Sequence, residues 1–256
     1  MGVYTEEIHL AGHDGDELRA VLHRPEAPTR PLPGIVLIHE VFGADAFMLA
    51  VGERLAGAGF VTILPDLYTR EGLPGPVGTA AEPAPEWTAD QIHAAVASLP
   101  DRRVLRDLDA AAERLAGEPE VDPDRIGTIG FCMGGTYAFL FGCHSRRIAA
   151  VVDFYGRIVY PELGQNKPLQ PLEMALNLSV PLLGFFGAED TSIPMEHVES
   201  LREALTRFAK PFELMTVPGA GHGFVNHLRK NYSRPDAEAA WEHTLSFLGE
   251  AFELDD

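Results

Sequence analysis

Continuous apolar runs recur along the chain, and the intervals between them leave room for helices. The runs are rich in Ile, Val, Leu and Phe, which is typical of strands buried on both faces of a parallel sheet. They occupy residues 35–39, 60–64, 125–131, 148–154, 180–186 and 212–217. Two further β-like runs, 3–10 and 18–23, flank Asp14 and Gly15, and this turn signal predicts a hairpin before the first parallel strand.

Segments with apolar residues at helical spacing lie between the predicted strands. They cover residues 47–58, 88–98, 102–117, 133–143, 195–208 and 237–252. Alternating strands and helices predict an α/β fold with a mostly parallel open sheet and helices on both faces. We expect residues 1–256 to form one domain, because no segment has the composition of a linker. The longest irregular stretch, 71–87, is rich in Gly, Pro and Ala and is a candidate lid.

The strongly negative net charge of the chain argues against some classes of binding partner. The chain has 38 acidic and 20 basic residues and a formal net charge of −18, which repels nucleic-acid phosphates and anionic lipid. We therefore expect neither nucleic acid nor a membrane as a partner. The sequence has no apolar run of transmembrane length and no signal-peptide pattern at its start. We expect a cytoplasmic protein in which both cysteines, Cys132 and Cys143, stay free thiols.

The sharpest chemical signal is GFCMGG at residues 130–135, where a predicted strand gives way to a predicted helix. This is the nucleophile-elbow pattern of α/β-hydrolases, with Cys132 where serine usually stands. Gly130 and Gly134 fit the pattern because side chains at those positions would clash across the tight turn. The start of a helix favours a thiolate through its dipole and offers a backbone N–H to an oxyanion. The alternative is a structural cysteine beside glycines that pack a helix.

Two more polar residues follow predicted strands, where open α/β sheets gather catalytic groups. Asp190 closes the segment GAED, in which Glu189 is a competing acid, and His222 lies in the glycine-rich loop GAGHGF. Each of these residues alone is compatible with an ordinary loop position. The order Cys132, Asp190, His222 is the order of an α/β-hydrolase triad, so together they predict a nucleophile, an orienting acid and a base.

A carboxylate stands at the end of the first predicted parallel strand, in HEVFG at residues 39–43. In α/β-hydrolases the loop after this strand supplies an oxyanion-hole N–H, and we expect it from Val41. Glu40 would disfavour a resting thiolate on Cys132 by like-charge repulsion, and it could accept the thiol proton when the geometry changes. The alternative is an acid that faces solvent. HEVFG lacks the second histidine of a zinc-binding HExxH motif.

In their order along the chain, these segments resemble the dienelactone hydrolase family. The resemblance rests on HEVFG, LPDLYTR, GFCMGG, GAEDTSIP and GAGHGF, which span nearly the whole sequence. It implies an α/β-hydrolase fold and a triad of Cys132, His222 and Asp190. It also implies Glu40 as an added catalytic carboxylate and Met133 as the second backbone donor to the oxyanion. In that family the resting thiol is neutral, and substrate binding moves the glutamate so that a thiolate forms.

The type enzyme of the family binds a substrate carboxylate with two arginines, and this chain departs from that pattern. Residues 71–101 contain no Arg, and the position four after His222 is Asn226. A carboxylated lactone and a neutral ester or lactone are therefore both candidate substrates.

The candidate substrate pocket is drawn from residues near these motifs: Phe42, Tyr68, Arg70, Trp87 and Phe224. We expect no metal or organic cofactor, because the sequence has no ligand cluster and no nucleotide-binding glycine pattern. The resulting prediction is a monomer or small homo-oligomer that hydrolyses a small-molecule ester or lactone. The alternatives are a short-chain acyl esterase or thioesterase with the same machinery, and a non-catalytic small-molecule-binding protein.

Overall fold

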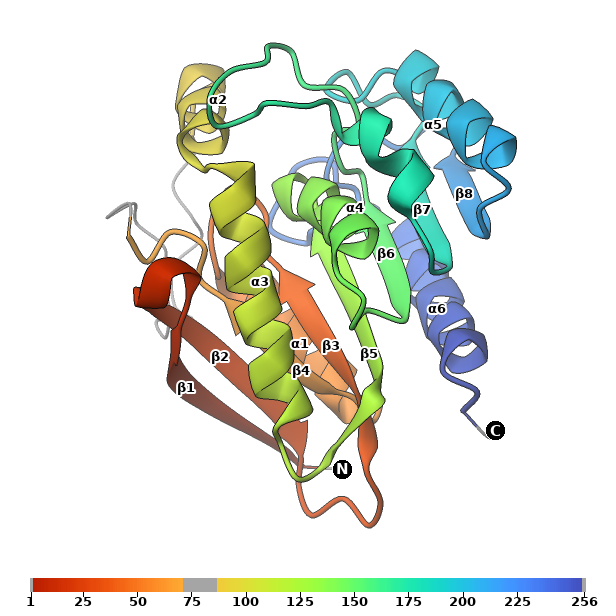
Figure 1. Ribbon diagram of the computed structural model, residues 1–256. Coiled ribbons are helices and arrows are strands. Elements are labelled where there is room, and N and C mark those ends of the chain that lie inside the picture. The colour runs from red at the N-terminus through yellow and green to blue at the C-terminus, as the bar shows by residue number, and fades with distance from the viewer. Residues whose placement is uncertain (1, 71–86, 255–256) are drawn as a thin grey trace.

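One eight-stranded sheet organises the protein, with strands in the order β1-β2-β4-β3-β5-β6-β7-β8 (Figure 1). The computed structural model describes residues 2–70 and 87–254. Of the candidate lid at 71–87, only Trp87 belongs to these described residues. The pairs β1–β2 and β2–β4 are antiparallel, and the other neighbouring pairs are parallel. The strands are β1 Val3–Ala11, β2 Glu17–Pro25, β3 Leu32–Ile38, β4 Val61–Pro65, β5 Val121–Phe131, β6 Ala150–Phe154, β7 Leu182–Gly187 and β8 Phe212–Val217.

Helices connect these strands, and the α/β prediction is confirmed. The α-helices are α1 Ala46–Gly57, α2 Ala89–Ser98, α3 Asp101–Ala116, α4 Met133–His144, α5 Met195–Arg207 and α6 Arg234–Ala251. Two 3-10 helices are η1 His13–Gly15 and η2 Pro171–Asn177. Within the described ranges, no helix is both long enough and apolar enough to cross a bilayer.

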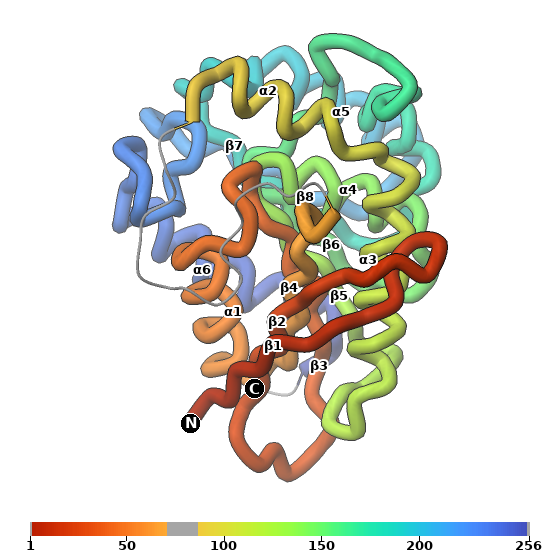
Figure 2. Tube along the Cα trace, turned by 90° about the vertical axis from the view of Figure 1, so that its left-hand side faces the viewer, coloured from red at the N-terminus to blue at the C-terminus, as the bar shows by residue number. Residues whose placement is uncertain are grey.

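The helices form a layer on each face of the sheet (Figure 2). Strand β3 shows why its sequence is apolar without interruption. Val36 and Ile38 point into a core shared with α3, α4 and α5. Ile35 and Leu37, one residue out of step, point into a second core shared with α1 and α6. Because successive side chains of a strand face opposite sides, a strand between two helical layers must be apolar at every position.

The observed boundaries differ from the predicted ones mainly at turns. The β1–β2 connection contains Asp14 with φ 56° and Gly15 with φ 79°, which agrees with the turn signal read from the sequence. Strand β5 begins at Val121, before the predicted start at residue 125. The helix η2, after β6, was not predicted from the sequence, because its short 3-10 turn carries no helical repeat of apolar residues.

Candidate active site

Cys132 occupies the sharp turn between β5 and α4. Its backbone angles, φ 55° and ψ −117°, are ones that non-glycine residues rarely adopt. The N–H of Cys132 donates to the carbonyl of Phe154 on β6 at 2.9 Å, and its carbonyl accepts from the N–H of Gly135 at 3.0 Å. These bonds fasten the turn to the neighbouring strand and to the first turn of the helix, so the strained conformation is held from both sides.

Two glycines let the backbones meet closely at this turn. A Cβ atom on Gly130 would overlap the carbonyl of Gly134. A Cβ atom on Gly134 would overlap the carbonyls of Ile38 and His39, at the end of β3. Only glycine fits at these two positions, because the backbone of the turn lies against its own next turn and against the end of β3. This is the steric requirement that the motif predicts.

The three residues of the predicted triad form one line of contacts at the carboxyl edge of the sheet. Nε2 of His222 lies 3.1 Å from Sγ of Cys132. Nδ1 of His222 lies 2.7 Å from Oδ2 of Asp190. The other oxygen of Asp190 accepts the backbone N–H groups of Ser192 and Ile193, at 2.7 and 3.0 Å. Asp190 is thus fixed by its own loop and has one oxygen left to orient the imidazole.

The electrostatics of these groups support proton transfer at the thiol. Burial alone would lower the pKa of His222, but the neighbouring Cys132 and the contact with Asp190 outweigh it and raise that pKa well above its usual value. Glu189, the competing acid, is exposed. Burial raises the pKa of the Cys143 thiol to about 12, so this second cysteine stays protonated and is a poor nucleophile.

Glu40 is buried rather than solvent-facing, with only 3% of its surface exposed. Its oxygen Oε1 accepts the hydroxyl of Tyr155 at 3.2 Å, and Oε2 accepts the amide of Asn226 at 2.6 Å. Burial and the neighbouring Asp45 raise the pKa of Glu40, and the hydrogen bond from Asn226 opposes them. Two neutral donors therefore hold this carboxylate next to the triad.

Tyr155 is a site residue that the sequence reasoning missed. It directly follows β6 with φ 47°, so the neighbouring strands β5 and β6 are each followed at once by a strained non-glycine residue. Its ring lies edge-on to His222, with centroids 5.0 Å apart. Burial and Glu40 raise the pKa of Tyr155 well above its usual value, so its hydroxyl keeps the proton that it donates. The available signal was its place at a strand end, which it shares with the triad residues.

A buried histidine orients the peptide that carries the expected oxyanion donor. Nδ1 of His39 donates to the carbonyl of Glu40 at 2.6 Å, and Gly43 N–H donates to the same oxygen at 3.1 Å. Nε2 of His39 accepts Leu67 N–H at 3.1 Å, and burial lowers the pKa of His39, so the ring is neutral. Because C=O and N–H of a trans peptide point in opposite directions, fixing the Glu40 carbonyl also aims the N–H of Val41.

Tyr68 supports this loop from beneath. Its hydroxyl donates to the carbonyl of Val41 at 2.9 Å and contacts Sδ of Met133 at 3.5 Å. Met133 is the first residue of α4, and an N–H at that position has no partner within the helix. Tyr68 is only 1% exposed, so its ring lies in the core of the protein and its hydroxyl reaches this loop.

Of the other predicted pocket residues, Phe42 and Trp87 lie together next to Val41. Their rings meet edge-on with centroids 5.9 Å apart, and both side chains are half-buried. The guanidinium of Arg229 lies over the face of Phe42, 3.5 Å from the ring centroid. These three side chains form an aromatic and cationic wall beside the oxyanion loop.

The side chains of Arg70 and Phe224 contact other parts of the protein. The guanidinium of Arg70 pairs with Asp107 at 2.7 and 3.0 Å and with Asp16 at 3.2 Å, so it braces the β1–β2 turn against α3. Phe224 is completely buried and packs against Tyr155, with centroids 5.7 Å apart. The ring of Phe224 therefore packs beneath Tyr155 and helps to hold it in place.

A second buried polar cluster lies apart from the triad. Nζ of Lys167 donates to Asp101 at 2.6 Å and to the carbonyl of Leu99 at 2.9 Å, and the hydroxyl of Tyr160 donates to Asp101 at 3.2 Å. These bonds fasten the long connection after β6 to the start of α3. Across residues 2–70 and 87–254, no group of three His, Cys, Asp or Glu side chains could hold a metal ion, and we assign none to this cluster.

Comparison with known sequences agrees with this architecture. The family model described as the dienelactone hydrolase family matches residues 18–252. A protein of Yersinia pestis, provisionally named a carboxymethylenebutenolidase, is 34% identical over 247 residues, which are 96% of this chain and 88% of that protein. A Bradyrhizobium protein, provisionally named a lactonase for 2-oxo-3-(5-oxofuran-2-ylidene)propanoate, is 34% identical over 237 residues, covering 93% of this chain and 91% of its own.

Solved structures give the same result for the fold. A Klebsiella pneumoniae protein provisionally identified as a dienelactone hydrolase superposes with a TM-score of 0.87 at 30% identity, over 97% of this chain and 99% of its own. An acylaminoacyl peptidase of Pyrococcus horikoshii superposes with a TM-score of 0.74 at 18% identity, over all of this chain and 43% of its own, and supports the fold alone.

Proposed function

This chain belongs to the dienelactone hydrolase family and acts on lactone or ester bonds, and on that premise we propose that Cys132 is its nucleophile. In this proposal His222 is the general base and Asp190 orients it. The observation that carries the assignment is the line of contacts from Cys132 through His222 to Asp190, at 3.1 and 2.7 Å. A base within hydrogen-bond reach of the nucleophile, itself held by a third group, is the geometry of nucleophilic catalysis.

The first half-reaction forms a thioester. His222 Nε2 removes the proton from the thiol, and Sγ of Cys132 attacks the substrate carbonyl carbon. The carbonyl oxygen becomes an oxyanion and accepts the N–H groups of Val41 and Met133. When the tetrahedral intermediate collapses, the bond to the ester or lactone oxygen breaks, and the leaving oxygen takes the proton from His222. For a lactone, the leaving oxygen stays attached to the acyl group.

The second half-reaction releases the acid. His222 removes a proton from a water molecule, and the resulting hydroxide attacks the thioester carbon. The same two N–H groups stabilise the second oxyanion. The carbon–sulfur bond then breaks, and the thiolate recovers its proton from His222. Asp190 keeps Nδ1 protonated throughout, so that Nε2 faces Cys132 in both half-reactions.

Glu40 is proposed as an accessory carboxylate that keeps the resting thiol neutral. A negative charge buried beside Cys132 and His222 disfavours a thiolate. The raised pKa of Glu40 also makes its carboxylate a stronger base than an exposed glutamate. Once it leaves Tyr155 and Asn226, it can therefore accept the thiol proton in place of His222 and pass that proton to the leaving oxygen. A thiol that stays protonated at rest is less open to oxidation.

The proposed substrate is a small ester or lactone that lies against Phe42 and Trp87. The names of the Yersinia and Bradyrhizobium relatives support a lactone. A panel of lactones, p-nitrophenyl esters and acyl thioesters tests the bond type, since the thioesterase alternative predicts fastest turnover of the last group. A panel without any turnover by the folded enzyme would instead favour a non-catalytic binding protein.

Trapping the intermediate tests the nucleophile directly. The enzyme is mixed with a slowly hydrolysed p-nitrophenyl ester, quenched with acid and digested with chymotrypsin, which cleaves after the aromatic residues between Cys132 and Cys143. The peptides are then analysed by mass spectrometry. We expect the acyl group on the peptide that contains Cys132, with none on the peptide that contains Cys143. Acylation at another residue, or rapid turnover by Cys132→Ala, would remove Cys132 from its proposed role.

A further inference from the structure

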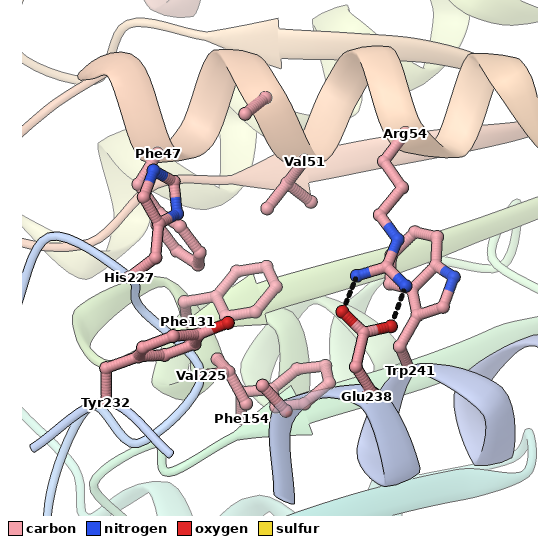
Figure 3. Close-up of a pocket in the computed structure, with 12 residues that line it drawn as sticks. Phe47, Val51, Arg54, Phe131, Phe154, Val225, His227, Tyr232, Glu238 and Trp241 are labelled. Atoms are coloured by element: carbon pink, nitrogen blue, oxygen red, sulfur yellow. Dashed lines mark hydrogen bonds and ion pairs between the residues drawn. The ribbon is translucent and has the colours of Figure 1, made fainter. Parts of the chain in front are cut away.

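A hollow of about 240 Å³ opens between α1 and α6, in the helical layer opposite α3 and α4 (Figure 3). The loop that follows Phe224 closes one end of it with Val225, His227 and Tyr232. Its lining, as far as the chain is described, includes none of the residues of the proposed triad. The hollow therefore lies apart from the catalytic carbonyl site.

Aromatic and aliphatic side chains form the floor of the hollow. Phe131 and Phe154 stack with centroids 4.6 Å apart, and Phe47 meets Phe131 edge-on at 5.4 Å. Figure 3 shows these rings and Val51 of α1 directed toward the same space. All four side chains are at least nine-tenths buried, so the floor is preformed by the core of the protein.

The rim of the hollow carries one more aromatic ring and an ion pair. Arg54 on α1 and Glu238 on α6 form an ion pair across the mouth. The guanidinium also lies over the ring of Trp241, 4.2 Å from its centroid. Because these two charges neutralise one another, and the whole chain has a net charge of −18, the hollow offers no net attraction to an anion. Its chemistry favours an uncharged ligand.

We propose that this hollow is a second ligand site, for a small uncharged aromatic molecule of one substituted ring. An apolar cavity of about 150 Å³ takes up benzene, so this larger space admits a ring with substituents. It is smaller than the pockets of about 300–1,000 Å³ that hold drug-sized ligands. Aromatic walls on several sides provide edge-on and stacked contacts for such a ring. His227 and Tyr232 add polar groups to the lining that can hydrogen-bond a hydroxyl or carbonyl substituent.

The floor of the hollow lies directly next to the turns that carry Cys132 and Tyr155. Phe131 immediately precedes Cys132, and Phe154 immediately precedes Tyr155, the two residues with positive φ at the ends of β5 and β6. The wall formed by Val225 and His227 flanks Asn226, whose amide holds Glu40. A ring bound here would contact the side chains next to both strained residues without entering the site of ester cleavage.

The two tryptophans of the chain allow the site to be tested by binding alone. Trp241 lines the hollow, whereas Trp87 packs on Phe42 beside the oxyanion loop. The probe is 4-fluorophenol, titrated into the full-length ¹⁵N-labelled protein at neutral pH, and Trp87→Phe assigns the two indole N–H signals. We expect a saturable shift of the Trp241 signal. Since binding is measured and not turnover, the result does not depend on the proposed roles of Cys132 and His222.

Two substitutions on α1 complete the experiment. Ala50 is exposed and lines the hollow, so Ala50→Phe fills the space without disturbing the core, and we expect it to weaken 4-fluorophenol binding by about tenfold or more. Glu53 is exposed on the same helix but does not line the hollow, so Glu53→Phe serves as the matched control and keeps wild-type affinity. An unmoved Trp241 signal at millimolar probe, or a shift that survives Ala50→Phe, would overturn the proposal.

Discussion

Nε2 of His222 and Sγ of Cys132 are 3.1 Å apart, although ninety positions separate the two residues in the sequence. Cys132 follows β5 and His222 follows β8, and β6 and β7 lie between these strands in the sheet. The loop of His222 must therefore reach back across two strands to meet the thiol. The contact exists only when the sheet is complete, so reactivity of the thiol reports on the whole fold.

Removing the thiol tests this contact most simply. We expect Cys132→Ala to lower ester or lactone turnover by about 10⁴-fold or more, since loss of a triad nucleophile removes the covalent pathway. Cys143→Ala is the control, because Cys143 is buried in α4 and its thiol stays protonated. Initial rates with a p-nitrophenyl ester measure both variants. Equal losses in both variants would mean that the effect is structural.

Glu40→Gln is expected to slow turnover and to change the pH dependence of iodoacetamide labelling at Cys132. The substitution is nearly isosteric and keeps an oxygen for Tyr155 or Asn226, but it removes the buried charge. Without that charge the thiolate is less disfavoured, so labelling of the resting enzyme should extend to lower pH. Mass spectrometry of the labelled peptide, followed across pH, gives the profile.

The matched control for Glu40 is Glu189→Gln, which removes an exposed acid from the loop of Asp190. It should leave both turnover and the labelling profile at the wild-type values. If Glu40→Gln also matched wild type in both measurements, the mechanism would reduce to Cys132, His222 and Asp190 alone.

His39→Leu should lower kcat by about ten- to a hundredfold with a smaller effect on KM. The ring of His39 fixes the Glu40 carbonyl and, through the same peptide, the direction of the Val41 N–H. Loss of one oxyanion donor costs about 10²–10³-fold in kcat, and a misdirected donor should cost somewhat less. Steady-state kinetics are compared with His23→Leu, a second fully buried histidine, on β2. A similar fall in both variants would assign the effect to packing.

Asp153 should make the protein less stable as pH rises through the acid range. Its carboxyl is 1% exposed, and burial raises its pKa from 3.8 to about 7, against the hydrogen bond from Gly156 N–H. Between these two pH values the unfolded chain loses this proton while the folded protein keeps it, so stability falls as pH rises and levels off above about 7. A shift of this size corresponds to about 4 kcal/mol.

Urea denaturation of wild type and Asp153→Asn at several pH values measures this effect. Asn keeps an oxygen that can accept Gly156 N–H but has no proton to lose in this range. The difference in unfolding free energy between the two proteins should therefore change in favour of the variant from pH 4 to pH 7. A constant difference across that range would show that Asp153 is ionised in the folded protein throughout.

Much of the fold was predictable because burial on two faces leaves a strong pattern. The apolar run at 35–39 predicted β3. Two adjacent residues of that strand, Ile35 and Val36, do pack into opposite cores. Segments that depend on distant contacts left no such pattern. Arg70 was predicted to be a pocket residue because it lies in the motif LPDLYTR, but its direction is set by Asp107, on α3. Proximity in sequence cannot reveal a partner supplied by another helix.

The same reason explains what was missed in the candidate site. Cys132, Asp190 and His222 stand in local motifs at strand ends, so their types and order could be read directly. Tyr155 stands at a strand end as well, but it lies in no recognised local motif. Its hydrogen bond to Glu40 joins residues 115 positions apart and required the completed sheet.

The positive φ of Cys132 means that the residue proposed for catalysis lowers the stability of the fold. A glycine adopts φ 55° without strain, so Cys132→Gly should raise the free energy of unfolding by on the order of 1 kcal/mol while removing the thiol. A sequence selected for thermal endurance alone would carry glycine at that position. Stabilising substitutions sought for this enzyme by screening heat resistance alone would accordingly include inactive molecules, and a screen that couples heating to turnover is needed to exclude them.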